Sequence, residues 1–258
     1  FLDPARRDEH GAKTVLIADC TPDVCRLLPQ LMSKARFVML KLSPMLDWHK
    51  AIADLKGTVD EVHIVSVGGE CKELLLVLAG KVSVPSVDSG SLENGVRVYC
   101  VDIMPKAEAD GEYKRSEFCY TIGGAADNIP TPNSQLSTLN SQFLFEPNAS
   151  IMKAGCFAEL SQAYGVEAIG PNSHLFVSSG RVEQFPGRKF AIEAVCTLNK
   201  RQLKQTLGTL KQANIAVRNF PMSVAELRKR LKLRDGGDTY IFATTTMEGE
   251  HVLIICRK

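Results

Sequence analysis

The side chains best suited to chemistry lie at the start of the chain. Asp3 and Pro4 follow two apolar residues, and Arg6 and Arg7 come shortly afterwards. Pro4 fixes its own φ and keeps Asp3 out of the helical region, so this stretch is predicted to be a strand end that turns into a loop. A carboxylate at the carboxyl end of a strand lies where open α/β sheets bind their ligands.

Group transfer to the amine of a nucleic-acid base is one reaction that this stretch could serve. Such a transfer needs an acceptor for the amine proton, a nearby carbonyl and a rigid loop that holds both. Asp3 and Pro4 would supply these features, and the guanidinium groups of Arg6 and Arg7 are suited to holding a phosphate. Asp-Pro is also common in ordinary turns, so the spacing alone leaves a structural role open.

Lys41 is a further candidate because it interrupts an apolar strand predicted over residues 36–42. Its ammonium group would either face a ligand at the carboxyl edge of the sheet or extend out of the core to reach water.

The remaining composition excludes several classes of site. The eight cysteines are scattered singly, with no CxxC pair and no Cys/His cluster of zinc spacing. This predicts reduced thiols in the core of a cytoplasmic protein and no metal site. No Walker A, HExxH, G-x-S-x-G or G-x-G-x-x-G motif is present, and no apolar run is long enough to span a membrane.

Charge is unevenly distributed, although the net charge is only +2. Residues 181–258 hold 15 Lys/Arg and 7 Asp/Glu, and the rest of the chain is acidic. A basic module on an acidic body suggests an anionic partner, with nucleic acid as the first candidate. A solvated basic face without a partner is the alternative.

The predicted phosphate contacts are Arg218 and three consecutive residues of an amphipathic helix, Arg228, Lys229 and Arg230. Phe220 is the only aromatic residue close to them in sequence. Because base stacking needs interleaved aromatic rings, this pattern favours contact with the nucleic-acid backbone over reading of its bases.

Alternating helices and strands predict an α/β fold. Residues 1–104 are predicted to form the second half of a doubly wound sheet, finished by antiparallel strands. Residues 105–142 follow as an irregular connection, and residues 186–258 contain a small βαβαββ module. A half sheet exposes an unpaired edge, so self-association through that edge is a further expectation.

Two predictions concern local helix boundaries. Thr21 is predicted to cap the first helix, with Pro22 at its first helical position and an interruption or kink at Pro29. A single later helix is predicted to start at Glu146 and to run to about Tyr164.

Several of these segments, in this order, resemble a known family. They are similar to the C-terminal part of bacterial class I S-adenosylmethionine-dependent methyltransferases that carry a THUMP-like C-terminal domain, and the likeness covers nearly the whole chain. The segments are Leu2-Asp3-Pro4-Ala5-Arg6-Arg7, Asp19-Cys20-Thr21-Pro22-Asp23-Val24, Lys41-Leu42-Ser43-Pro44-Met45-Leu46-Asp47, Val65 to Leu74, Phe143 to Asn148 and Leu227 to Leu233.

The resemblance implies three domains. These are a partial Rossmann-like methyltransferase domain in residues 1–104, a ferredoxin-like connector in residues 105–185 and a THUMP-like basic domain in residues 186–258. It also implies S-adenosylmethionine as cofactor, held by a glycine-rich loop and an acidic residue expected upstream of Phe1. The implied partner is RNA, either tRNA or rRNA.

The resemblance also assigns residue roles. Asp3 to Arg6 would form the loop after the fourth sheet strand, similar to the Asp/Asn-Pro-Pro-x motif of nucleic-acid methyltransferases, but Ala5 replaces the second proline. Asp3 would orient or deprotonate the target, and Pro4 would shape the loop. Arg6, Arg7 and Lys41 would meet phosphate.

Two functions are therefore expected. The first is an RNA methyltransferase, present here as a C-terminal fragment that is inactive alone. The alternative is a non-catalytic RNA-binding or assembly protein on a degenerate methyltransferase fold.

Overall fold

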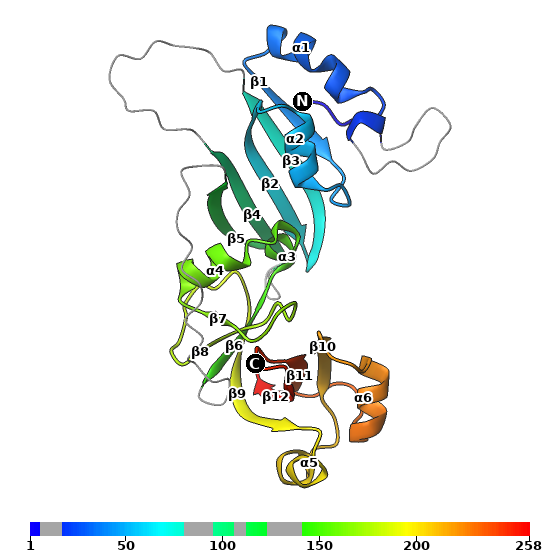
Figure 1. Cartoon of the computed structure of the whole chain (residues 1–258), viewed down its shortest axis with the longest axis vertical. Coiled ribbons are helices and arrows are strands. Elements are labelled where there is room, and N and C mark those ends of the chain that lie inside the picture. The colour runs from blue at the N-terminus through cyan, green and yellow to red at the C-terminus, as the bar shows by residue number, and fades with distance from the viewer. Residues whose placement is uncertain (6–16, 80–94, 106–111, 123–140) are drawn as a thin grey trace. The chain divides into compact units, whose positions relative to one another are not determined.

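The computed structural model describes residues 1–5, 17–79, 95–105, 112–122 and 141–258 (Figure 1). The chain divides into two compact units, each built on its own sheet. The first unit comprises residues 1–128 and 149–155, and the second comprises residues 129–148 and 156–258.

The first unit contains a five-stranded mixed sheet in the order β1-β3-β2-β4-β5. β3 runs antiparallel to both of its neighbours, β2 and β1. β2 and β4 are parallel, and β5 returns antiparallel to β4. The strands are β1 (Phe37–Leu42), β2 (Val59–Val67), β3 (Glu70–Ala79), β4 (Val96–Pro105) and β5 (Tyr113–Ile122).

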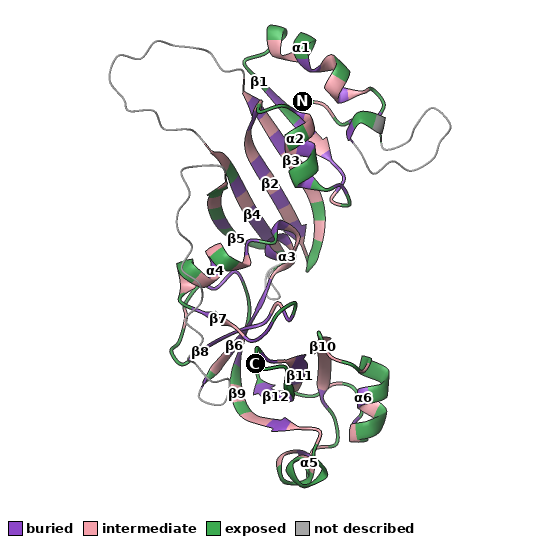
Figure 2. Cartoon of the chain, in the orientation of Figure 1, coloured by how far each residue is buried: buried purple, intermediate pink, exposed green. Residues whose placement is uncertain are grey.

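Burial alternates along these strands, as period-2 side-chain geometry requires. In β2 the buried residues are Val59, Val62, Ile64 and Ser66, and from Val62 onward they alternate with half-buried residues (Figure 2). The buried Ser66 hydroxyl donates a hydrogen bond of 2.5 Å to the carboxylate of Asp102 on β4. One face of the sheet is therefore core, and the opposite face is half-exposed.

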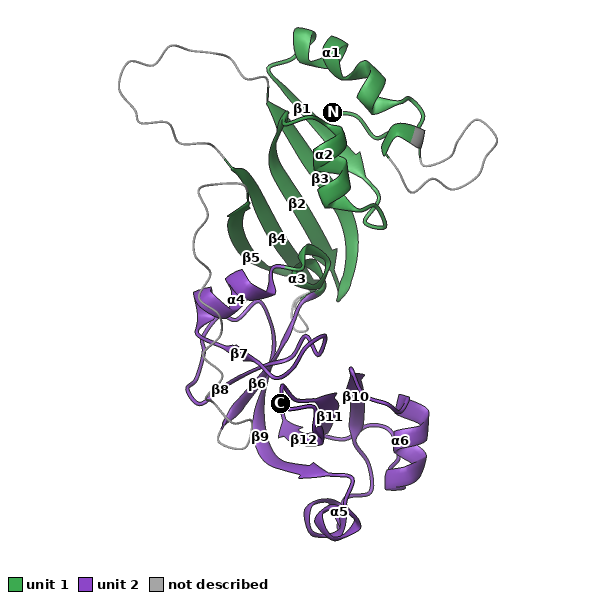
Figure 3. Cartoon of the chain, viewed as in Figure 1, with its two compact units in different colours: residues 1–128, 149–155 green, residues 129–148, 156–258 purple. Residues whose placement is uncertain are grey.

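The helical elements of the first unit are η1 (Ile17–Asp19), α1 (Val24–Lys34), α2 (Trp48–Asp54) and α3 (Ala149–Ala154). α3 follows the other three by about a hundred residues, yet it contacts β2, β3 and β4 and so belongs to this unit (Figure 3). Asp47 caps α2 by accepting hydrogen bonds from the backbone N–H groups of His49 and Lys50.

The second unit contains a seven-stranded sheet in the order β10-β11-β12-β9-β6-β8-β7. Among its described strands, β10 and β11 are the one pair of parallel neighbours. The strands are β6 (Phe143–Pro147), β7 (Glu167–Ala168), β8 (Phe176–Ser178), β9 (Gly187–Thr197), β10 (Asn214–Arg218), β11 (Thr239–Thr245) and β12 (His251–Arg257).

Two hydrophobic clusters, one on each face of this sheet, stabilise the second unit. On one side, Leu207 of α5 (Lys200–Leu207) and Leu227 of α6 (Val224–Leu231) pack with Ile241 and Leu253. The other cluster includes Phe190, Phe242 and Ile254. The order β9-α5-β10-α6-β11-β12 is the predicted βαβαββ module.

Two local predictions are wrong. The first helix is capped by Asp23, whose carboxylate accepts from the N–H of Arg26, because the backbone of Thr21 is instead paired with Ala5. α1 also runs through Pro29, so the predicted interruption is wrong, whereas the alternative of a kink at Pro29 stays a prediction.

The single helix predicted from Glu146 is also wrong. Phe143 to Pro147 form β6, because they pair with β8 and β9. The helical part is divided into α3 and α4 (Phe157–Tyr164), and Gly155 separates them at a positive φ of 73°.

β5 completes the first sheet. Its residues, 113–122, were predicted to lie in the connector, but they pair with β4. The outer edge of β5 pairs with no strand among the described residues, and self-association through it stays a prediction. No described helix is long and apolar enough to cross a membrane.

Candidate functional site

Asp3 lies at the carboxyl edge of the first sheet. Leu2 pairs in parallel beside β1: its N–H donates to Met39 O at 2.9 Å, and its carbonyl accepts from Lys41 N at 2.9 Å. The chain therefore leaves this edge at Asp3. Pro4 is buried, and the next residue, Ala5, is fixed by two backbone hydrogen bonds to Thr21 of 2.8 and 3.0 Å.

The carboxylate of Asp3 forms an ion pair with Lys41. The distance from Lys41 Nζ to Asp3 Oδ2 is 3.0 Å, and that to Glu73 Oε2 is 3.5 Å. The hydrogen bond with Asp3 is the main reason that the pKa of Lys41 is raised, and Glu73 adds to it. The structure thus brings together two predicted residues that are 38 positions apart, and adds Glu73, which the sequence did not single out.

This cluster can offer a carboxylate at a strand end to a polar ligand. The side chain of Asp3 is 54% exposed and that of Lys41 is 34% exposed, so both are accessible to solvent. Lys41 is balanced by two carboxylates, which reduces the positive charge that it can offer to phosphate. Arg6 and Arg7 lie outside the described residues, and their predicted role stays a prediction.

The described residues at this edge do not by themselves fit S-adenosylmethionine. Nucleotide cofactors are commonly held where a strand passes through a glycine turn into a helix. Gly68 and Gly69 lie at this edge, but they close the hairpin between β2 and β3, with φ of 60° and 87°. The carboxylate of Asp3 is already engaged by Lys41.

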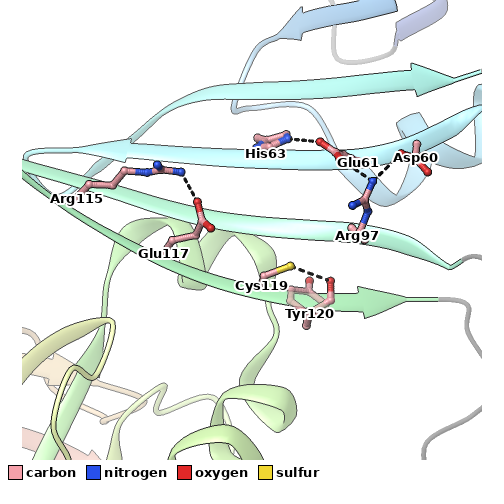
Figure 4. A network of polar contacts seen from close by, with 8 residues as sticks. All are labelled: Asp60, Glu61, His63, Arg97, Arg115, Glu117, Cys119 and Tyr120. Atoms are coloured by element: carbon pink, nitrogen blue, oxygen red, sulfur yellow. Dashed lines mark hydrogen bonds and ion pairs between the residues drawn. The ribbon is translucent and has the colours of Figure 1, made fainter. Parts of the chain in front are cut away.

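A second polar group lies on the half-exposed face of the same sheet (Figure 4). Arg97 on β4 pairs with Asp60 at 2.9 Å and with Glu61 at 2.7 Å. Glu61 is 2.9 Å from His63, whose ring stacks on Tyr99 at 4.6 Å. These charges satisfy one another across the strands, so we assign this network to stabilisation of the sheet.

The same face carries an ion pair between Arg115 and Glu117 on β5, and Cys119 near them (Figure 4). Cys119 is an exposed residue, but partial desolvation of its sulfur, together with the charge of Glu117, raises the pKa of the thiol and opposes formation of a reactive thiolate. Within the described ranges, no group of three or more His, Cys, Asp or Glu could hold a metal ion.

The predicted basic residues of the second unit are not gathered at one point. Arg228 is half-buried and ties α6 to the sheet, donating to Ala213 O at 3.0 Å and to Asp235 Oδ1 at 2.6 Å. Lys229 and Arg230 follow it and are exposed. Since Ala213 directly precedes β10, Arg228 lies near the start of that strand.

Arg218 lies at the other end of β10 and takes part in a separate cluster. Its guanidinium donates to Glu146 Oε1 at 2.8 Å, and Arg188 donates through Nε to Glu146 Oε2 at 2.7 Å and also through a terminal nitrogen. The side chain of Glu146 is only 7% exposed. Neither Glu146 nor Arg188 is among the site residues predicted from the sequence; the available signal is that Glu146 directly follows the apolar run Phe143-Leu144-Phe145.

The backbones of β6 and β9 also approach each other closely beside Glu146. A Cβ on Gly187 would lie 2.2 Å from the carbonyl oxygen of Glu146. Only glycine allows β9 to approach β6 this closely. The carboxylate and the glycine together join β6 to β9 and β10.

Both parts of the second unit match known domain families. Residues 187–258 match the THUMP domain-like family, and residues 143–186 match a ferredoxin-like domain family. The boundary between the two matches falls at the start of β9, beside Glu146 and Arg188. No curated protein matches the chain.

The whole chain also resembles a solved crystal structure. It superposes on a crystal structure of a putative methyltransferase from Porphyromonas gingivalis W83, with a TM-score of 0.77 and 30% sequence identity. The match covers 99% of this chain and 58% of that one, so the chain spans little more than half the length of its relative. The predicted fold, α/β with a ferredoxin-like segment and a THUMP-like domain, is confirmed. The limits 1–104, 105–185 and 186–258 stay predictions.

Proposed function

We propose that these residues belong to a bacterial class I S-adenosylmethionine-dependent methyltransferase that acts on RNA in the cytoplasm. One observation carries the proposal: the likeness at 30% identity to a protein described as a methyltransferase extends over 99% of the chain. The THUMP-like match supports RNA as the partner, because the module it covers is strongly basic.

In this proposal the first unit supplies the substrate edge. Asp3 accepts a hydrogen bond from the target group, and the buried Pro4 holds its backbone at the strand end. Lys41 is a positioning residue, because it acts through its hydrogen bond to Asp3. Arg6 and Arg7 would hold a phosphate of the RNA.

S-adenosylmethionine would supply the methyl group, bound by parts of the protein that these residues do not include. The described residues at the carboxyl edge lack a strand-to-helix glycine turn for it, as shown above. We therefore expect the 258-residue chain to be inactive alone.

One observation favours the alternative of a non-catalytic RNA-binding or assembly protein. The ion pair with Lys41 engages Oδ2 of Asp3, so the carboxylate already has a structural partner. A catalytic Asp3 would bind the substrate with its remaining acceptor sites or in exchange for Lys41, whereas a structural Asp3 would keep this pair alone.

Calorimetry with S-adenosylmethionine tests the proposal. We expect binding heat from the protein encoded by the complete reading frame and none from the 258-residue chain. Absence of heat from the complete protein would favour the non-catalytic alternative.

A further inference from the structure

A strongly basic surface covers the two helices of the THUMP-like domain. Residues 200–235 contain ten Lys/Arg and only two Asp/Glu. Two of the ten, Arg218 and Arg228, are paired as described above. The other eight are exposed and form no ion pair within the part of the chain that the structure describes. We call these eight residues the helical basic surface: Lys200, Arg201, Lys204, Lys211, Lys229, Arg230, Lys232 and Arg234.

The two acids of this segment do not neutralise that surface. Glu226 accepts hydrogen bonds from the backbone N–H and the hydroxyl of Ser223, at 2.8 and 2.7 Å, in the capping box that starts α6. Asp235 pairs with Arg228 at 2.6 Å. The exposed cations are therefore left without compensation from the same helices.

The backbone brings the two ends of the surface together. Arg234, after α6, donates its N–H to Lys211 O at 2.9 Å, and its carbonyl accepts from Ala213 N at 3.0 Å. Leu207 of α5 and Leu227 of α6 are buried in the same hydrophobic cluster. Both helices thus cover one face of the sheet, and their polar sides form one outer layer.

Interaction with the helix dipoles explains only some of the cations on the helical basic surface. Lys204 and Lys229 lie in the last turns of α5 and α6, where cations complement the helix dipole. Lys200 and Arg201 lie in the first turn of α5, where the same dipole disfavours them. A helix that carries unpaired cations at both ends is better explained by an anionic ligand.

The side chains available indicate which anionic ligand fits. Residues 187–258 contain four aromatic residues: Phe190 and Phe242 are buried, and Phe220 and Tyr240 are half-buried in the two cores. Without exposed rings, the surface lacks the stacking platforms that hold single-stranded nucleic acid. Double-stranded RNA is bound largely through its phosphates and its shape, so exposed cations without stacking rings suit it better.

We propose that the helical basic surface binds the sugar-phosphate backbone of base-paired RNA. This inference rests on the proposed function in taking RNA as the partner, and it adds the secondary structure of the RNA and the surface that contacts it.

Fluorescence anisotropy of the 258-residue chain tests the proposal with two probes, a 20-base-pair RNA duplex and a 20-nucleotide oligouridine. We expect the duplex to bind at least five-fold more tightly at 50 mM salt. Lys229→Gln combined with Arg230→Gln should weaken duplex binding about five- to ten-fold and lower the salt slope by about 1.8, since each lost contact contributes about 0.9.

Arg181→Glu is the matched control, because it changes the net charge by the same amount outside this surface. Arg181 is exposed and paired only with the exposed Glu183 in the described structure. We expect its duplex affinity to change less than two-fold. Equal weakening by both variants would overturn the assignment of the surface.

Oligouridine binding as tight as the duplex would overturn the preference for base-paired RNA and leave the proposed methyltransferase untouched. Absence of binding to either probe would refute this inference and remove the RNA contact of the THUMP-like domain from the proposed function. S-adenosylmethionine binding by the complete protein is measured separately, so the two failures can be told apart.

Discussion

Replacing the buried Glu146 with glutamine should destabilise the second unit. The carboxylate accepts hydrogen bonds from both Arg188 and Arg218, and its side chain is 7% exposed. The substitution keeps the volume of the side chain but removes the charge and one acceptor oxygen. Arg218 Nε is already buried without a hydrogen-bond partner among the described residues, so further loss leaves that guanidinium poorly satisfied.

The expected loss of free energy of unfolding depends on how exposed the two arginines are. Hydrogen bonds to charged groups contribute about 1.5–3 kcal/mol each when buried. Arg188 and Arg218 are 51% and 40% exposed, so water can replace part of what is lost. We therefore expect Glu146→Gln to lower the free energy of unfolding by about 2 kcal/mol, less than the ~3–5 kcal/mol for a fully buried ion pair.

Urea unfolding followed by two probes gives the measurement. The single tryptophan, Trp48, is buried in the first unit, whereas circular dichroism reports both units. Glu146→Gln should move the circular-dichroism transition to lower urea and move the Trp48 transition less.

Glu183→Gln is the matched control, since that glutamate is 69% exposed and its pair with Arg181 should contribute less than about 1 kcal/mol. The reasoning is refuted if the two glutamine variants lower stability by the same small amount.

Three further predictions concern single positions. Gly187→Ala should destabilise by about 1–3 kcal/mol in urea unfolding, because its Cβ would meet Glu146 O at 2.2 Å; unchanged stability would contradict the close approach. Burial lowers the pKa of His174. Neutral His174 therefore contributes its full stability above the unfolded pKa of about 6.5, and this contribution is lost as the pH falls towards the folded pKa. His174→Gln should flatten the decline in the urea midpoint between about pH 7.5 and 5. Burial raises the pKa of Cys256 to about 12, so a thiol reagent at about pH 8 should label the exposed Cys119 and spare Cys256 in the native protein, as peptide mass mapping would show.

The sequence predicts best where local signals are sufficient. Asp47 and Ser223 are recognisable helix caps, and both form the expected hydrogen bonds. The βαβαββ order of the C-terminal module follows from apolar runs and turn residues. These features depend on contacts between residues only a few positions apart.

Long-range pairing explains what the sequence could not predict. Phe143 to Pro147 end in a sequence typical of a helix start, but pairing with β8 and β9 makes them a strand. Thr21 could cap a helix, but its backbone pairs with Ala5 across 16 positions.

The candidate site shows the same limit. Asp3 and Lys41 were each identified from local pattern, but their contact depends on the parallel pairing of Leu2 with Leu40. Glu146 and Arg218 are 72 positions apart, and nothing in either neighbourhood indicates that they meet.

Methyl transfer by the protein from the complete reading frame tests the central claim most directly. Tritiated S-adenosylmethionine would be incubated with RNA and either the unaltered protein or its Asp3→Ala variant, with RNA binding and S-adenosylmethionine binding measured in parallel. We expect label in the RNA with the unaltered protein, and at least a hundred-fold less with Asp3→Ala while both ligands still bind. Undiminished labelling by the variant would contradict the role of Asp3, and absence of labelling by the unaltered protein would contradict the proposed RNA methyltransferase.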